Sequence, residues 1–249
     1  NPFYFLNTLA GVNGTAVCEN KIVSSAGTLF ANSSACNLIA RVQSSGANPV
    51  IVNVNACVTL QATQQCFNGE PYVQRHYDIE PAVNPATSTA TITLYFYDAE
   101  FVAYNTNNPV WPKLPTFAGG ANADPNRATL RVTQFHGTPI SFPSSPGNYM
   151  NPGTVGVINP GVGNIFWNGT FWEITFPVTA FSGFYVHSTI FGTPLPIVVN
   201  YFTGVKQNGD HLLNWKVTCT STPHATIEME RSTDGRNYSS IYSIYATAL

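Results

Sequence analysis

Residues 50–60 read Val-Ile-Val-Asn-Val-Asn-Ala-Cys-Val-Thr-Leu, with an apolar residue at every second position from Val50 to Leu60. Polar residues stand between them at Asn53, Asn55 and Thr59. Successive side chains of a β-strand point to opposite faces, so this spacing predicts a strand with one face on a hydrophobic core.

The same period of two recurs along the chain. It is present in residues 91–96, Thr-Ile-Thr-Leu-Tyr-Phe, and in residues 129–133, Thr-Leu-Arg-Val-Thr. Helical periodicity is nearly absent, and the best segment for a helix is a turn or two at residues 98–104, with Asp98 as the N-cap. The chain is therefore predicted to be all-β, with residues 1–192 forming one β-sandwich.

Two long segments interrupt this strand pattern. Residues 105–126 and 137–163 are rich in Gly, Pro and Asn, and neither has the repetitive composition of a linker. Loops of such length inside a compact domain are unusual and often functional. Both are assigned to the first domain, which we expect to end at Gly192-Thr193-Pro194.

A hairpin is predicted around Asn168-Gly169, the strongest short signal for a tight turn between strands. A two-residue turn would pair Trp167 with Thr170, Phe166 with Phe171 and Ile165 with Trp172. Trp167 and Trp172 would then share a face with Ile165, Ile174 and Phe176. Because that whole face is apolar, we expect both indoles to lie in the core rather than to form a ligand platform.

Three strand signals follow Pro194, in residues 211–217, 226–232 and 240–245, with a turn at Asp234-Gly235. We interpret residues 194–249 as the opening half of a fibronectin-III-like sandwich. A complete sandwich of this kind takes roughly 100 residues, whereas about 55 follow Pro194. Half a sandwich leaves an apolar face and a strand edge uncovered. We expect further residues of the polypeptide or another molecule to cover them.

The composition excludes several classes of protein. Charged residues make up 9% of the chain and the formal net charge is −2, with lysines and arginines scattered, so a nucleic-acid surface is not expected. No apolar run approaches the length of a membrane-spanning helix. Low charge with many Asn, Ser and Thr residues suits an extracellular or cell-surface β-protein. The start at Asn1 instead of Met suggests a processed chain or an excerpt.

The five cysteines show no metal-ligand spacing. Cys57 and Cys66 bracket a polar turn, which favours a disulfide that closes a hairpin, and Cys18 with Cys36 is then the natural second pair. The alternative is that all five are buried thiols. Cys219 is left over in either scheme, free or joined to a partner outside this chain.

Residues for catalysis are not arranged in a recognisable pattern. A glycosidase needs two carboxylates that face a cleft. The available carboxylates lie on separate predicted elements: Asp78, Glu80, Asp98, Glu100, Asp124 and Glu173. There is no Gly-x-Ser-x-Gly elbow, and His76 and His136 fit hydrogen-bonded structural histidines. We predict no catalytic residue, no metal ion and no cofactor.

Arg75 falls on the same face of its predicted strand as Val73, Tyr77 and Ile79. An arginine that points toward a core must be paired with a carboxylate. We expect a structural partner, which is Glu80, Asp78 or a carboxylate distant in the sequence.

Sugar binding without catalysis would require exposed aromatic rings. Trp111, between Pro109 and Pro112, is the best candidate, and Tyr104 and Tyr149 lie near or in the long loops. The alternative for Trp111 is that it holds the loop against the sandwich.

The order of motifs resembles a family of large secreted and cell-surface proteins of Bacteroidota that use the type IX secretion route. The resemblance covers roughly residues 70–245, and the first 70 residues match only loosely. The matching segments are residues 71–81, 91–96, 99–101, 130–137, 172–176, 181–186 and 230–235. The resemblance implies export, surface display and a fibronectin-like module ahead of a C-terminal sorting domain, and it carries no catalytic residues.

These observations favour a non-catalytic extracellular or cell-surface structural or adhesive protein. We expect a protein partner, or self-association by strand addition, at the incomplete C-terminal sandwich. The alternative is a carbohydrate-binding module, with a polysaccharide as partner. A hydrolase is the least favoured of the three.

Overall fold

The structure is a computed structural model that describes residues 8–11, 13–67, 69–149, 155–188, 197–208, 210–219 and 224–247. It divides into two compact units, residues 1–192 and 193–249, which we describe separately.

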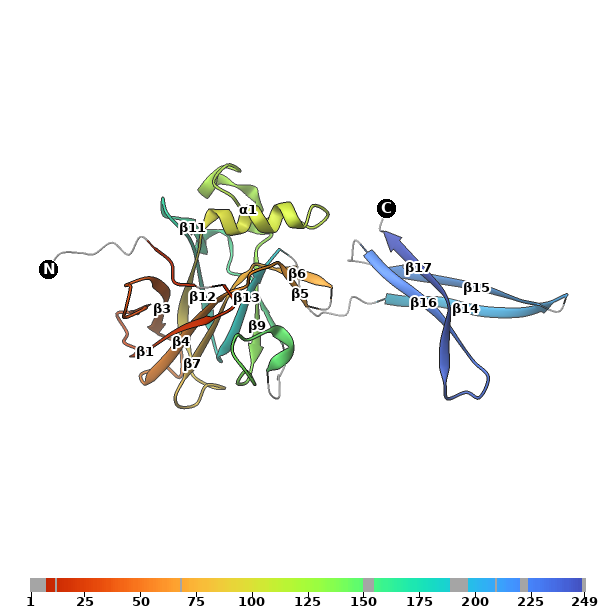
Figure 1. Ribbon diagram of the computed structural model, residues 1–249, viewed down its shortest axis with the longest axis horizontal. Helices are drawn as coiled ribbons and strands as arrows, with labels where there is room; N and C mark the ends of the chain where they lie inside the picture. Colours follow the sequence, from red (N-terminus) through yellow and green to blue (C-terminus); the bar gives the residue numbers. More distant parts are fainter. Residues whose placement is uncertain are drawn as a thin grey trace. The chain divides into compact units, whose positions relative to one another are not determined.

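Unit 1 is built almost entirely of antiparallel strands (Figure 1). Its described strands are β1 (Ala16–Ile22), β2 (Thr28–Ala31), β3 (Leu38–Ser44), β4 (Asn53–Leu60), β5 (Gln65–Phe67), β6 (Glu70–Tyr72), β7 (Arg75–Pro81), β8 (Ala90–Phe96), β9 (Arg131–His136), β10 (Gly156–Ile158), β11 (Ile165–Trp167), β12 (Trp172–Val178) and β13 (Ser182–His187). Its described helices are α1 (Asp98–Asn107) and four short 3-10 turns, η1 (Ala121–Ala123), η2 (Pro125–Ala128), η3 (Pro146–Asn148) and η4 (Val162–Asn164). The predicted all-β fold class is confirmed.

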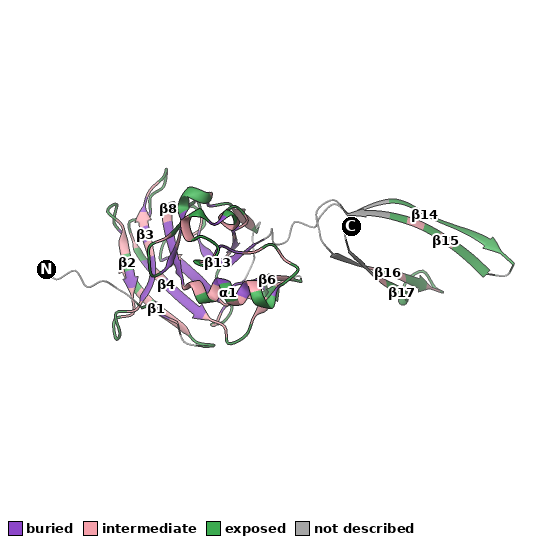
Figure 2. Ribbon diagram, turned by 90° about the horizontal axis from the view of Figure 1, so that it is seen from above, coloured by how far each residue is buried: buried purple, intermediate pink, exposed green. Residues whose placement is uncertain are grey.

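Two sheets make the sandwich. One has the strand order β1-β4-β7-β13-β9-β10, and the other has the order β11-β12-β8-β3-β2. Their inner faces supply the main hydrophobic core. Aromatic rings meet across it: Tyr77 lies against Phe96 and Phe176 lies against Phe184, each pair with ring centroids 5.6 Å apart. Figure 2 shows this burial concentrated on the strands of unit 1.

The strand at residues 53–60 is more deeply buried than its alternation predicts. Val54, Ala56 and Val58 face the core as expected. Cys57 and Thr59, on the opposite face, are also only 1% exposed. The outer face of the six-stranded sheet is therefore covered at these two positions as well.

Helix α1 lies across one end of the sandwich (Figure 1) and buries Phe101 and Tyr104. Asp98 is its first residue, and the N-cap is Tyr97, so the predicted cap is wrong by one position. The Glu100 side chain accepts a hydrogen bond from the backbone N–H of Tyr97 (2.9 Å). Asp98 instead accepts from the indole N–H of Trp172 (2.9 Å), which ties the helix to β12.

The hairpin of β11 and β12 has a different register from the predicted one. Trp167 pairs with Trp172, and Ile165 pairs with Ile174. The turn therefore spans residues 168–171, because the Asn168 side chain accepts hydrogen bonds from the N–H groups of residues 170 and 171. A shift of two positions keeps each side chain on its face. Trp172 is fully buried and Trp167 packs partly against the core, as predicted.

Both long loops are held by specific contacts. In the first, Leu114 is buried in the core and Asp124 accepts hydrogen bonds from the N–H groups of Thr116 (2.9 Å) and Asn126 (2.8 Å). In the second, Ser144 and Tyr149 bond to Asp78 of β7. The second loop thus covers the part of the outer face of the six-stranded sheet around Asp78.

Unit 2 consists of two hairpins, β14 (Ile197–Gln207) with β15 (Asp210–Cys219), and β16 (His224–Ser232) with β17 (Tyr238–Thr247). The three predicted strands are present, and the Asp234 side chain accepts from the N–H groups of residues 236 and 237 in the predicted turn. Strand β14 was not predicted. Its register shifts between Val199 and Tyr201, so its apolar residues do not keep one alternation.

Candidate functional site

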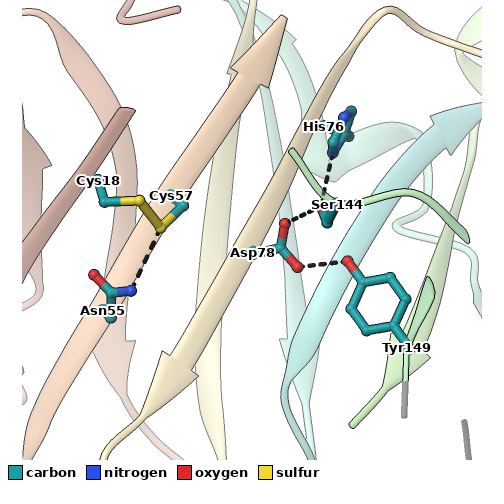
Figure 3. The surroundings of a disulfide bond; sticks show 7 residues. All are labelled: Cys18, Asn55, Cys57, His76, Asp78, Ser144 and Tyr149. Carbon is teal, nitrogen blue, oxygen red and sulfur yellow. Dashed lines mark hydrogen bonds between the residues drawn. A yellow bond between two sulfur atoms is a disulfide. The ribbon is translucent and has the colours of Figure 1, made fainter. Parts of the chain in front are cut away.

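A buried polar cluster lies on the outer face of the six-stranded sheet (Figure 3). The carboxylate of Asp78 accepts hydrogen bonds from the hydroxyls of Ser144 and Tyr149. Ser144 is also 3.4 Å from Nδ1 of His76, and Tyr185 stacks on the His76 ring with centroids 4.8 Å apart. The cluster joins β7, β13 and the second long loop.

This cluster contains Ser, His and Asp, but not in the order that activates a serine. In a catalytic triad the histidine stands between the serine and the carboxylate. Here Ser144 stands between His76 and Asp78. All three side chains are at most 4% exposed, so a substrate does not reach the serine hydroxyl in this conformation. The arrangement fits a structural tether for the loop.

Burial sets the protonation of the cluster. Desolvation raises the pKa of Asp78 to about 6, and the hydrogen bonds from Ser144 and Tyr149 oppose this rise. Desolvation lowers the pKa of His76 to about 3, so the ring is neutral at pH 7.

Gly183 makes the cluster possible. It lies opposite Asp78 on β13, and a Cβ at this position would be 2.0 Å from the Tyr149 hydroxyl oxygen. Sequence reasoning identified Tyr149 only as a loop aromatic and did not single out Gly183 or Ser144. A glycine inside a strand rich in large side chains, as in Phe181-Ser-Gly-Phe184, is a signal for a close approach of this kind.

The six candidate carboxylates do not converge on a cleft, and each accepts a hydrogen bond from within unit 1. Besides Asp78, Asp98 and Asp124, Glu80 accepts from Thr138 (2.9 Å) and Glu173 from Asn168 (2.7 Å). Glu100 forms an ion pair with Arg75, with an N–O distance of 2.8 Å. Arg75 is 2% exposed, so the predicted inward arginine is confirmed, and its partner is the carboxylate distant in sequence.

The aromatic residues suggested for sugar stacking do not form a common exposed surface. Tyr104 is 1% exposed and its hydroxyl lies 2.9 Å from the Ser188 hydroxyl, while Tyr149 is bound to Asp78. Both proposals of an exposed tyrosine ring are therefore wrong, because helix packing and the polar cluster bury the two rings. Trp111 is half-buried in the turn after α1.

The disulfide differs from the predicted pairing. It joins Cys18 of β1 to Cys57 of β4, which lie directly opposite each other in the sheet, whereas Cys36 and Cys66 are free and exposed. The predicted pairs relied on proximity in sequence, but β1 and β4 are paired across a separation of 39 residues. The side chain of Cys219 lies outside the described residues. A structural disulfide is consistent with an oxidising, extracellular environment.

Unit 2 exposes several large apolar side chains, and Figure 2 shows the described parts of its strands as mostly exposed. Phe202, Tyr238 and Tyr242 are 59%, 59% and 51% exposed. A groove of about 310 Å³ lies between the hairpins, lined by Phe202, Trp215, Ile227, Glu228, Met229, Glu230 and Tyr242. Each described strand of unit 2 pairs with one other strand.

Two further properties concern the described residues only. They contain no group of three or more His, Cys, Asp or Glu side chains positioned to hold a metal ion. None of the helices among them is both long and apolar enough to span a membrane.

No protein-family model, no curated protein and no solved structure matches this chain.

Proposed function

We propose that this chain is a non-catalytic structural or adhesive protein of the cell surface or extracellular space, and that unit 2 is its assembly surface. The observation that carries the proposal is the exposed apolar groove between the two hairpins of unit 2. Contiguous exposed apolar surface of this kind marks a site of protein association.

The backbone of unit 2 supports the same proposal. Each described strand has one hydrogen-bonded neighbour, so its other edge offers unpaired N–H and C=O groups. A single two-stranded hairpin is only marginally stable in water. Strands added from a neighbouring molecule would satisfy these edges and cover the apolar face.

The order of the hairpins fits the fibronectin-III-like interpretation. Two successive antiparallel hairpins, β14 with β15 and β16 with β17, would correspond to the opening strands of such a sandwich. The partner then has a defined chemistry: extended segments with apolar residues at alternate positions, which complete both sheets.

Export is proposed on three grounds. The described disulfide belongs to oxidising compartments, the charged content is low, and the motifs of residues 70–245 resemble type IX secreted proteins of Bacteroidota. None of the six candidate carboxylates is arranged for two-carboxylate chemistry, which favours a binding role over hydrolysis.

Light scattering after size-exclusion chromatography tests the assembly. We expect the mass of the full chain to rise with concentration. Phe202→Ser, in the groove, should shift the chain toward a monomer, whereas Ile51→Ser, at an even more exposed apolar position of unit 1, should not. A well-folded monomer of the unmodified chain at every concentration would count against self-assembly through unit 2.

A further inference from the structure

Unit 1 has a polar groove that shares no lining residue with the buried cluster and has no role in the proposed assembly. It consists of two adjoining hollows that share Glu80 and Pro85. One, of about 340 Å³, is also lined by Asn20, Asn55, Pro81 and Ala82. The other, of about 440 Å³, extends over Ala86, His136, Gly137, Thr138, Thr179, Ala180 and Phe181.

Three side chains form a row across this groove. Asn20 of β1 lies directly opposite Asn55 of β4, and Asn55 lies opposite Glu80 of β7. Opposite residues of antiparallel strands share a face, so the three side chains stand in line at intervals of about 4.8 Å, the spacing between strands. This interval is close to the length of one sugar ring in an extended polysaccharide.

Two side chains of the row are held by hydrogen bonds, and two of its strands are cross-linked. The disulfide between Cys18 and Cys57 joins the same two strands two residues away on the same face. The Asn55 amide donates a hydrogen bond to the Cys57 sulfur (3.4 Å), and the Thr138 hydroxyl donates one to Glu80 (2.9 Å). A preorganised polar site loses less entropy on binding.

The chemistry of the lining defines the ligand. Amide groups both donate and accept hydrogen bonds, and a carboxylate accepts strong ones from hydroxyls. Neither hollow is lined by a lysine or an arginine among the described residues, so an anion would meet Glu80 without a compensating charge. The lining therefore suits a ligand that is neutral and rich in hydroxyl groups.

We propose that this groove binds a neutral oligosaccharide, with Asn20, Asn55 and Glu80 bonding to hydroxyls of successive sugar units and His136 and Thr138 extending the site. The ring of Pro85 at the junction of the hollows provides an apolar contact for a sugar face. This site replaces the two buried tyrosines, Tyr104 and Tyr149, as the place where the chain would contact a polysaccharide.

An NMR titration of the full chain with cellohexaose, xylohexaose and laminarihexaose tests the proposal, with tetragalacturonate as the anionic comparison. We expect at least one neutral hexasaccharide to shift the amides of residues 20, 55, 80 and 136–138. Glu80→Gln should weaken this binding by roughly tenfold, because one charge-assisted hydrogen bond is lost. Asn20→Ala, at an exposed position that does not threaten folding, should also weaken it.

Glu173→Gln is the matched control, since Glu173 is an equally half-buried carboxylate on the other sheet. It should leave the titration unchanged. The proposal is overturned if no neutral hexasaccharide shifts these amides at millimolar concentration, if Glu80→Gln and Asn20→Ala bind like the unmodified chain, or if tetragalacturonate binds equally well.

Discussion

Gly183 is the residue whose size most directly determines how the second long loop is attached. Its missing Cβ leaves room for the Tyr149 ring, which reaches Asp78 over β13. We predict that Gly183→Ala displaces Tyr149 and lowers the free energy of unfolding by about 1–3 kcal/mol, as overpacking does in tight sites. Chemical denaturation followed by tryptophan fluorescence would measure the loss.

Gly156→Ala is the matched control for this change. Gly156 also lies in a strand of the six-stranded sheet, but a Cβ there would meet no atom within 4 Å. Equal stability losses in the two variants would contradict the role assigned to Gly183.

Asp78 and His76 make opposite contributions to stability when the pH falls. The folded state binds a proton at Asp78 near pH 6, above the unfolded value of 3.8, so acidification through this window favours folding. The folded state keeps His76 neutral down to about pH 3, below the unfolded value of 6.5, so acidification favours unfolding. Between pH 6 and pH 4 the two effects largely cancel.

We therefore predict that Asp78→Asn steepens acid destabilisation. Relative to the unmodified chain, the variant should lose roughly 1.4 kcal/mol per pH unit between about pH 6 and pH 4, since each pKa unit corresponds to that energy. Urea denaturation at a series of pH values measures the difference in slope. Parallel curves for the two proteins would show that Asp78 does not take up a proton in this range.

For single residues, the sequence predicted the face on which a side chain lies better than it predicted the residue that the side chain contacts. The period of two placed Arg75 on the inner face of its strand, and its burial required a carboxylate. It did not identify Glu100, because the partner comes from α1 and no local spacing links the two residues. Tyr149 and Tyr104 were misjudged for the same reason: their burial depends on Asp78, Gly183 and Ser188, which lie far from them in sequence.

At the scale of elements, the edge strand β1 is held to β4 by the only disulfide among the described residues. Closing a loop across a separation of 39 residues stabilises the folded state by about 4 kcal/mol in the chain-entropy account. We predict a loss of up to this size for the double substitution Cys18→Ser and Cys57→Ser. Hydrogen exchange should become faster first in residues 16–22.

The free cysteines provide the control for this prediction. Cys36→Ser and Cys66→Ser change exposed thiols and should leave the unfolding midpoint unchanged. Peptide mapping that found a Cys57–Cys66 bond in the purified protein would contradict the strand pairing described here.

The hairpin of β11 and β12 shows how far local patterns reach. Asn168-Gly169 correctly located the turn, and the alternation correctly placed both tryptophans on the core face. The register was wrong by two positions because the Asn168 side chain caps a four-residue turn. Strand β14 was missed because its bulge interrupts the alternation. The alternation of apolar and polar residues therefore predicts which face of a strand a side chain lies on. Side-chain hydrogen bonds and bulges determine the register of the strands and the length of the turn.

At the scale of the whole molecule, the two units differ in how they bury their apolar surface. Unit 1 encloses its core between two sheets and covers part of the outer face of one of them with its own loop. Unit 2 leaves Phe202 and Tyr242 about half exposed around a groove. All-β architecture and the apolar strands of unit 2 could be predicted from alternation. The covering loop could not, because it depends on contacts between distant residues.

We propose that unit 2 gains stability from a neighbouring molecule that covers its groove and its strand edges. Hydrogen exchange of the amides in β14–β17, measured on the full chain over a range of concentrations, tests this most directly. We predict fast exchange in the dilute monomer and strong protection as the mass rises, with unit 1 protected throughout. Strong protection of β14–β17 in the dilute monomer would contradict the claim, because the hairpins would then need no partner.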